Sequence, residues 1–404
     1  MKYKNDVLAL VLAGGKGERL HPLTLERTKP SVPFGGKYRI IDFALSNMVN
    51  SGIYSIYVMV QYKSQSLIEH IRTTWQKTGV MSRHFVTVVP PQMRKEELKG
   101  WYRGTADSVY QNINLVYDFK PKFVAIFGGD HVYRMNIKEM LDYHIRNKAE
   151  VTLSVVPVQA ELSRHFGIVS VDSSMMVKKF IEKPLSKSKG EVFASMGNYI
   201  FNTETLIRVL EQDARKQSSH DFGRDIIPAL LEKKQSLYAY DFTKNRIPSL
   251  KKYEDKFYWK DVGTIKSYWD ANMDLLGVKP RLDLDNRDWL IYASNLNCPP
   301  LYVTGSVIDN SLIGEGARAC GSEIRNSILG RGVKVDEGCV IKDSIIMDFS
   351  HIEKNCKINK AIIDRFNVIG REETIGFGKS AGKYYLDSSG ITVVKRGARK
   401  DYYF

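Results

Sequence analysis

Apolar side chains recur with a period of 17 residues in the last quarter of this 404-residue chain. Three such series run in parallel, with steps of five or six residues from one series to the next. This self-similarity predicts a hexapeptide-type β-helix, in which each coil has three short faces and one apolar side chain per face fills the interior. A β-sandwich is the alternative, but it does not produce three interlocked series. The series are Ile324, Ile341 and Ile358; Leu329, Ile346 and Ile363; and Val335, Ile352 and Ile369.

The limits of this repeat divide the chain. An earlier relative of the repeat, VIDNSLI, lies at 307–313, and the period stops at about residue 370. We therefore predict a β-helix domain over 301–404, with an irregular tail over 371–404. A polar, proline-containing stretch at 278–300 predicts a linker in front of it.

Before residue 278 the pattern is different, because apolar runs alternate with helical patterns. This alternation predicts an α/β domain over 1–277, with a mostly parallel sheet and helices on both faces. Asp42 and Thr105 can cap the first and third helices, and Gly52 can end the first. The predicted strands cover 7–13, 56–61, 123–130 and 151–158, and the predicted helices cover 40–52, 64–76 and 105–119.

The charge of the chain bears on its partners. Most of the formal net charge of +15 lies before residue 301, because residues 301–404 hold 16 Lys and Arg against 13 Asp and Glu. A basic region suits nucleic acid or small polyanionic substrates. No basic cluster is interleaved with aromatic residues and no nucleic-acid-binding motif occurs. Phosphorylated small molecules are therefore the better fit, and we expect no nucleic acid partner.

Membrane, secreted and zinc proteins are disfavoured. No apolar run approaches the roughly 20 residues that span a bilayer. The N-terminus lacks the cleavage site of a signal peptide, so we expect a cytoplasmic protein that does not bind membranes. The four cysteines form no CxxC and have no histidine pair nearby, so we expect free thiols rather than a zinc site.

A glycine-rich turn follows the first predicted strand. The apolar run from Leu8 to Ala13 leads into GGKGERL, and Lys29 follows ten residues after Arg19. Glycines allow backbone N–H groups to approach a phosphate, and Arg and Lys supply the opposite charge. The spacing fits neither a P-loop nor a dinucleotide fingerprint. For the glycines alone, an ordinary turn with two surface cations is an equal alternative.

Two aspartates follow other apolar runs. Asp130 in FGGDH comes directly after a predicted strand, and Asp261 lies in YWKDVGT. The carboxyl ends of strands are where open α/β sheets bind ligands, and Mg²⁺ prefers a few carboxylates together with substrate phosphates. We therefore predict a Mg²⁺ site at these two residues. A lone aspartate in such a place is more often a helix cap or turn residue.

Further polar residues could recognise a sugar phosphate. In FIEKP, Lys183 can neutralise a phosphate while Glu182 accepts hydrogen bonds from hydroxyls, and Ser195 can do either. The segment GT at 104–105 opens a helix whose positive end would face the phosphates. Taken alone, EKP is typical of a surface turn, and Tyr102 is typical of a packing residue.

The order and spacing of these motifs resemble the bacterial glucose-1-phosphate adenylyltransferases. The resemblance covers nearly the whole chain, and FGGKYRIIDFALSN and HDFGRDIIP are its most specific segments. It implies a Rossmann-like nucleotidyltransferase domain followed by a left-handed parallel β-helix. It also implies the reaction of ATP with glucose 1-phosphate to give ADP-glucose and pyrophosphate, with Mg²⁺, in glycogen synthesis. Members of the family form homotetramers.

The resemblance assigns roles to individual residues. Arg19 and Lys29 would neutralise the triphosphate and the departing pyrophosphate. Asp130 and Asp261 would hold Mg²⁺. The other assignments are Tyr102, Gly167, Glu182, Lys183 and Ser195 for glucose 1-phosphate, and Gly14, Gly15, Gly17, Gln61, Gly104 and Thr105 for the nucleotide.

Two positions depart from the members that fructose bisphosphate activates. Glu26 stands in place of a lysine, and Asp118 stands in place of an arginine tied to inhibition by AMP. Both changes reverse the charge, so we expect activity to be retained and this regulation to be weakened or replaced.

Three alternative functions remain open at this point. A non-catalytic regulatory subunit would have lost the charged motifs, which are intact here. A bifunctional uridyltransferase and acyltransferase would need a histidine base on the β-helix, where only His351 lies. A pyrophosphorylase that uses another nucleotide differs only in how it recognises the base and the sugar.

Overall fold

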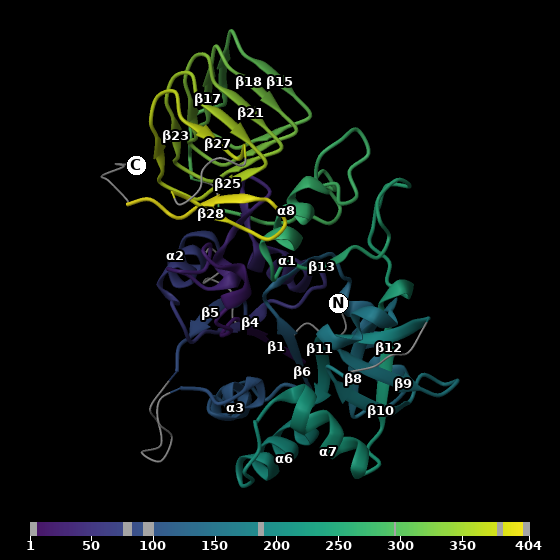
Figure 1. The fold of residues 1–404 in the computed structure, drawn as a ribbon. Helices are drawn as coiled ribbons and strands as arrows, with labels where there is room; N and C mark the ends of the chain where they lie inside the picture. Colours follow the sequence, from purple (N-terminus) through teal and green to yellow (C-terminus); the bar gives the residue numbers. More distant parts are fainter. Residues whose placement is uncertain are drawn as a thin grey trace.

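The computed structural model describes residues 6–75, 83–91, 101–184, 190–294, 296–377 and 383–398. Residues 1–5 and 399–404, the two ends of the predicted domains, lie outside the described residues. An α/β region forms one part of the molecule and a regular coil of short strands forms the other, as Figure 1 shows. This arrangement confirms the predicted fold class.

A nine-stranded sheet forms the centre of the α/β region. Its order is β10-β9-β11-β6-β1-β4-β5, and β8 and β12 continue it from β11. The neighbours β6, β1, β4 and β5 are parallel as predicted, whereas β11 runs antiparallel to β6, β8 and β9. The strands are β1 (Val7–Leu12), β4 (Ser55–Met59), β5 (Phe85–Val89), β6 (Phe123–Gly128), β8 (Val151–Gln159), β9 (Gly167–Val171), β10 (Val177–Glu182), β11 (Glu191–Asn202) and β12 (Leu237–Asp241).

Helices cover both faces of this sheet. Side chains alternate along a strand, and in β1 the residues Val7, Ala9 and Val11 enter one apolar core while Leu8 and Leu10 enter the other. The first core packs against α1 (Ile40–Asn50), α2 (Gln65–Thr74) and α5 (Ile137–Arg146). The second packs against α3 (Thr105–Tyr110), α4 (Asn114–Phe119), α6 (Thr203–Ala214) and α7 (Ile227–Glu232).

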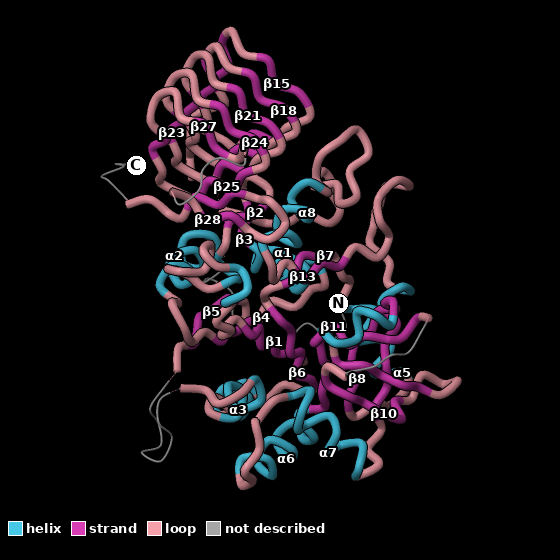
Figure 2. Tube along the Cα trace, in the orientation of Figure 1, coloured by secondary structure: helices cyan, strands magenta, loops and turns pink. Residues whose placement is uncertain are grey.

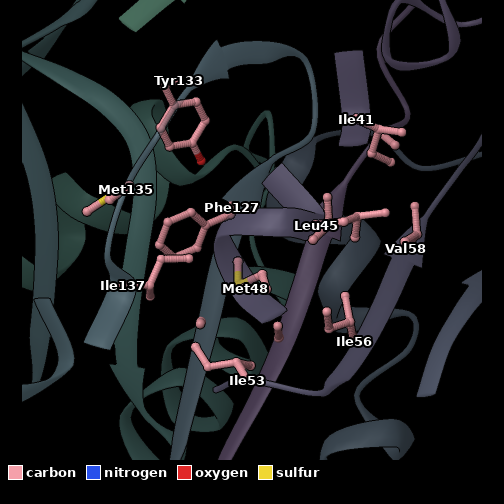
Figure 3. Packing of buried hydrophobic residues seen from close by; sticks show 14 of the residues in the cluster. Ile41, Leu45, Met48, Ile53, Ile56, Val58, Phe127, Tyr133, Met135 and Ile137 are labelled. Carbon is pink, nitrogen blue, oxygen red and sulfur yellow. The ribbon is translucent and has the colours of Figure 1, made fainter. Parts of the chain in front are cut away.

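The first core shows why α1 forms where it does. Ile41, Leu45 and Met48 recur at intervals of three and four residues, so they share one helix face. In Figure 3 they lie beside Val58 and Phe127 of the sheet, and all five residues are fully buried. Full burial of each such side chain contributes about 1.5–3 kcal/mol, which makes α1 a fixed support for the strand ends.

Two predicted helix caps differ in detail. The first helix begins at Ile40, so Asp42 occupies its third position, where the carboxylate accepts from the Arg39 N–H at 2.8 Å. The predicted helix at 105–119 is split into α3 and α4, and Gly104 rather than Thr105 is the cap of α3. Gly52, with φ of 80°, follows α1 as predicted.

The coil consists of three sheets, whose strand pairs are all parallel except that of β28 with β29. Figure 2 shows its successive turns stacked on one another. Each predicted series pairs in register, as in Ile324 with Ile341 and Ile341 with Ile358. The first sheet is β14 (Tyr302–Thr304), β17 (Arg318–Cys320), β20 (Lys334–Val335), β23 (His351–Ile352) and β26 (Val368–Ile369). The second is β15 (Val307–Asp309), β18 (Glu323–Arg325), β21 (Val340–Lys342), β24 (Lys357–Asn359) and β27 (Thr374–Ile375). The third is β16 (Leu312–Ile313), β19 (Ile328–Leu329), β22 (Ile345–Ile346), β25 (Ala361–Ile363), β29 (Thr392–Val394) and β28 (Tyr385–Leu386).

The coil continues beyond residue 370, where the sequence predicted an irregular tail. Ile375 pairs with Ile358 and so keeps the period. On the third face Val394 pairs with Ile363, which places the next inward position 31 residues along instead of 17. The longer connection hides the last turn of the coil from a search for a fixed period.

The connection at 278–300 packs against the α/β region. Leu282, Trp289 and Ile291 are buried, and the Trp289 Nε1–H donates to Asn47 Oδ1 at 3.1 Å. One apolar cluster joins both parts of the molecule, because it includes Phe34 of the α/β region and Ile345 of the coil. The short elements beside this cluster are β2 (Pro33–Phe34), β3 (Tyr38–Arg39) and α8 (Ile265–Met273).

Two further expectations concern cysteines and membranes. All four cysteines are free thiols, as predicted, and Cys339 and Cys356 are buried in the coil. Within the described ranges, no helix combines the length and the apolar character that crossing a bilayer requires.

Candidate active site

A cavity of about 880 Å³ opens at the carboxyl ends of β1 and β6. Residues from β9, β10 and β11 also line it. Every residue that the sequence singled out for chemistry lines this cavity. They are Gly14, Gly15, Gly17, Arg19, Lys29, Gln61, Tyr102, Gly104, Thr105, Asp130, Gly167, Glu182, Lys183, Ser195 and Asp261.

The glycine-rich turn lies between β1 and the 3₁₀ helix η1 (Glu18–Leu20). Gly17 has φ of 64°, and a Cβ atom added there would lie 3.1 Å from the Cβ of Lys29. Its carbonyl accepts from the Thr24 hydroxyl at 2.8 Å. Only glycine fits this position without strain, and the close contact seats Lys29 directly behind the turn.

Lys29 joins the two predicted metal ligands. It begins the 3₁₀ helix η2 (Lys29–Ser31), and its side chain is 6% exposed. Its Nζ lies 3.0 Å from Asp130 Oδ2 and 2.6 Å from Asp261 Oδ1. Arg19 Nη2 lies 3.6 Å from Asp261 Oδ2. Two carboxylates and two cations are thus gathered at one edge of the cavity.

A short ladder fixes the two carboxylates. The strands β7 (His131–Tyr133) and β13 (Trp259–Asp261) pair antiparallel, with Asp261 opposite His131. Asp130 directly precedes His131, so this ladder brings together two residues that lie far apart in the sequence. His131 Nε2 lies 3.9 Å from an oxygen of each carboxylate.

The electrostatics of this cluster keep both acids ionised. Burial favours the neutral form of Asp130, but the Lys29 ammonium overcomes it and holds the pKa of Asp130 well below its usual range. The same balance lowers the pKa of Asp261. Although burial acts against the charge of Lys29, the two carboxylates raise its pKa.

These two aspartates fit a magnesium ion. Both present hard carboxylate oxygens, and both already contact one cation, Lys29 Nζ. Among the residues that the structure describes, no group of three or more His, Cys, Asp or Glu side chains could hold a metal. An ion that takes one or two carboxylates and completes its shell with substrate oxygens and water is the type that suits this donor set.

Another part of the cavity lining is built around Glu182. A Cβ atom added to Gly167 or to Gly223 would lie 2.8 Å from Glu182 Oε2, so both glycines pack closely against this carboxylate. Lys183 has φ of 48°, and its Nζ lies 3.4 Å from Glu182 Oε1. Ser195 Oγ accepts from the Gly197 N–H at 3.2 Å.

Gln61 and Tyr102, which both line the cavity, are hydrogen-bonded to each other. Gln61 Oε1 accepts from the Tyr102 N–H at 3.1 Å, and its Nε2 donates to the Tyr102 carbonyl at 3.3 Å. The Asn112 side chain donates to the Tyr102 hydroxyl at 3.0 Å. Next to this pair, the rings of Tyr62 and Trp101 stack with centroids 4.7 Å apart.

The start of α3 differs from the sequence prediction. The Ala106 and Asp107 N–H groups both donate to the His220 carbonyl, at 2.8 and 3.2 Å. The helix end is therefore not open to a phosphate, although Gly104 and Thr105 line the cavity. The Thr105 hydroxyl donates instead to Asp221 Oδ2 at 2.9 Å.

The sequence did not identify all of the residues that line the cavity, and two residues that it linked to regulation lie outside the cavity. Asp221 and Gly223 line the cavity, but their segment HDFGRD served only as a family signature. Glu26 lies outside the cavity, 3.3 Å from Arg396 of the coil, and Asp118 is exposed near the end of α4. The missed signal in HDFGRD is its combination of a carboxylate with a glycine, the same combination found around Glu182.

Comparisons with known proteins cover both parts of the chain. The family model described as nucleotidyl transferase matches residues 8–277, and that described as GlmU-like, C-terminal hexapeptide matches residues 303–394. A protein of Thermodesulfovibrio yellowstonii is 49% identical, and the match covers 97% of each chain. A protein of Thermus thermophilus is 43% identical over 98% of this chain and 99% of its own, and one of Geobacter metallireducens is 43% identical over 96% and 97%. All three carry the name glucose-1-phosphate adenylyltransferase.

Proposed function

The chain belongs to the glucose-1-phosphate adenylyltransferases, a family of nucleotidyltransferases, and from this premise we propose that it converts ATP and glucose 1-phosphate into ADP-glucose and pyrophosphate. ADP-glucose is the glucosyl donor for glycogen, so the reaction would commit glucose to that polymer. The observation that carries the proposal is the Lys29 ammonium, which contacts both Asp130 and Asp261 at the edge of the cavity. Acids and cations at this edge suit the transfer of a nucleotidyl group, whose charge requirements are those of other phosphate-transfer reactions.

The chemistry requires little proton transfer. An oxygen of the sugar phosphate attacks the α-phosphorus of ATP, a new P–O bond forms, and the bond to the β-phosphate oxygen breaks as pyrophosphate leaves. The attacking phosphate is mostly ionised at neutral pH, because its second pKa is about 6. No general base is therefore needed, and catalysis rests on alignment and charge stabilisation.

Each side of the cavity has its own part in that alignment. The Gly14–Gly17 turn and Gln61 would receive the nucleotide, and Arg19 and Lys29 would stabilise the charge on the departing pyrophosphate. Glu182 would accept hydrogen bonds from sugar hydroxyls, while Lys183 would neutralise the sugar phosphate. Tyr102, Gly104, Thr105, Gly167 and Ser195 would complete the two subsites.

Asp130 and Asp261 would hold Mg²⁺ when the substrates bind. The ion would supply positive charge to the phosphate oxygens during transfer. Until then Lys29 and Arg19 together offset the charge of the two carboxylates, which explains how two ionised acids can share one lysine.

The alternative functions differ in what they need from this chain. A regulatory subunit would not need the intact contacts among Lys29, Asp130 and Asp261. An acyltransferase would need a histidine base on the coil, but His351 Nε2 is engaged with Asp336 at 3.0 Å. A different nucleotide would require only a different base-recognition surface, so nucleotide choice is the question to test.

The test measures pyrophosphate release from glucose 1-phosphate and Mg²⁺ with ATP, UTP, GTP or dTTP in turn. We expect a clear preference for ATP that Asp130→Ala abolishes. Activity confined to another nucleotide would preserve the reaction type but refute ADP-glucose as the product. Thermal stabilisation by the substrates without turnover would indicate the regulatory subunit.

We also propose that the protein is a cytoplasmic homotetramer. The first turn of the coil supports assembly, because its strands β14 and β15 expose Tyr302, Val303 and Val307. Light scattering of the purified protein tests the assembly, and a monomer at micromolar concentration would contradict it.

A further inference from the structure

A six-residue segment connects the β-helix to the catalytic carboxylates. Within residues 26–31, Arg27 reaches into the coil and Lys29, two positions later, reaches into the cavity. The Arg27 Nη2 lies 2.7 and 2.6 Å from the two carboxylate oxygens of Asp364, which follows β25. Arg27 and Asp364 are each 1% exposed, so the pair is sealed between the two parts of the molecule.

The coil holds Asp364 firmly in place. Its N–H donates to the Val394 carbonyl at 3.0 Å, and its own carbonyl accepts from the Ser350 hydroxyl at 3.0 Å. Its Oδ1 also accepts from the Arg365 N–H at 2.6 Å. The anion that Arg27 meets is therefore part of the rigid core of the coil.

The segment transmits position over a very short distance. The Thr28 carbonyl accepts from both the Ser31 N–H, at 3.1 Å, and the Ser31 hydroxyl, at 2.9 Å. Pro30 fixes one backbone dihedral inside the same turn. A displacement of Arg27 would therefore move Lys29, which lies one residue beyond Thr28.

We propose that Asp364 is a positioning residue for adenylyl transfer, because it holds Lys29 against Asp130 and Asp261 through Arg27. The inference rests on the proposed function of Lys29. The β-helix would then take part in catalysis, because a residue held rigidly in the coil fixes the position of a catalytic lysine. Misplacing a catalytic group by about 1 Å can lower a rate by about 100-fold, so the contact need not touch the substrate to matter.

The experiment compares Asp364→Asn with Asp348→Asn in the full-length protein. Asp348 is a coil aspartate of similar burial, whose carboxylate lies 3.0 Å from Arg331 and 3.6 Å from Arg365 rather than against Arg27. We expect Asp364→Asn to lower kcat for pyrophosphate release by about 10- to 100-fold while KM changes little. Asp348→Asn should lower the melting temperature but keep a kcat close to that of the wild type.

A double-mutant cycle separates positioning from loss of folding. If Asp364 acts through Lys29, then Asp364→Asn added to Lys29→Ala should cause no further fall in kcat. An equal fall in both backgrounds would overturn the inference. A fully active Lys29→Ala would instead refute the role proposed for Lys29, which is a different failure.

A second variant covers the case in which Asp364→Asn does not fold. Replacing Arg27 by Met together with Asp364 by Asn removes both charges at nearly the same volume. The folded double variant should show the same loss of kcat as Asp364→Asn. A double variant that folds and keeps the wild-type kcat would overturn the inference.

Discussion

Two cations that lie only two residues apart in the sequence, Lys29 and Arg27, each bind carboxylates, yet their surroundings differ. In the cavity, Lys29 meets Asp130 and Asp261, whose side chains are 39% and 23% exposed. At the junction with the coil, Arg27 meets Asp364 and both are nearly free of solvent contact. The first group can exchange its partners for a ligand, while the second cannot be reached without parting the two regions.

The difference in exposure indicates that the two sets of ion pairs have different roles. A buried ion pair adds little net stability, but removing one partner leaves a charge without compensation and is strongly destabilising. The junction pair therefore fixes a position. The cavity carboxylates, kept ionised by Lys29, remain ready for a metal and for substrate phosphates.

The largest expected effect is on catalysis in the cavity. Asp130→Ala should lower kcat by about 100- to 1,000-fold, because it removes a carboxylate from the charged centre of the reaction. Lys29 keeps Asp261 as its partner, so the free energy of unfolding should change by less than about 1 kcal/mol. Pyrophosphate release and urea unfolding measure the two quantities.

The control for that variant is Asp142→Ala. Asp142 pairs with Lys138 at 2.6 Å on α5, and neither residue lines the cavity. Its activity and its stability should both remain close to those of the wild type. If Asp130→Ala retained most of its activity, the cavity group would not be the catalytic one.

The next effect is on stability at the junction. Arg27→Met leaves Asp364 buried without its cation, so the free energy of unfolding should fall by about 3–5 kcal/mol. All five tryptophans precede residue 290, and the Trp269 Nε1–H donates to the Asp343 carbonyl of the coil at 3.2 Å, so tryptophan fluorescence during urea unfolding reports the loss. A loss no larger than that of Asp130→Ala would mean that the two groups are energetically alike.

A smaller effect separates the two regions by pH. Burial between Thr152 and Asn202 lowers the pKa of His144 to about 4, whereas an unfolded histidine has a pKa of about 6.5. The unfolded state binds this proton first as the pH falls, so the α/β region should lose about 3 kcal/mol between pH 6.5 and 4. Above pH 6.5 this contribution is fully present.

The coil should respond only to stronger acid. Burial opposes ionisation of Asp348, but Arg331 and Arg365 lower its pKa below the usual value, so its contribution is lost only as the pH falls below about 4. Urea unfolding of the wild type and of His144→Gln across this range tests the order. A wild-type stability that stays constant from pH 6.5 to 4 would contradict the role of His144.

The sequence predicts the coil better than it predicts the junction, for a physical reason. Every turn of the coil repeats the same inward position, so the fixed period of Ile324, Ile341 and Ile358 predicts that these residues pair. The pair of Arg27 and Asp364 joins positions 337 residues apart, and no local pattern marks either residue. The last turn of the coil could not be predicted either, because a longer connection interrupts the 17-residue period before it.

The candidate site falls between these two cases. Asp130 and the glycine turn follow strand ends, which is where ligands bind in such sheets, so their place could be predicted. The closeness of Asp130 and Asp261 depends on the β7–β13 ladder, whose three-residue strands leave no clear signal. The use of the α3 N–H groups by His220 could not be foreseen, because that residue comes from a distant loop.

The smallest expected effect concerns Glu26, at the outer edge of the junction. Its ion pair with Arg396 is partly exposed, with Glu26 at 61%, so Glu26→Lys should lower the free energy of unfolding by no more than about 1 kcal/mol. Because a carboxylate here repels phosphate and already holds an arginine, we expect fructose bisphosphate to activate the wild type weakly or not at all. Initial rates with and without fructose bisphosphate test this, and strong activation of the wild type would show that the junction accepts a phosphate despite Glu26.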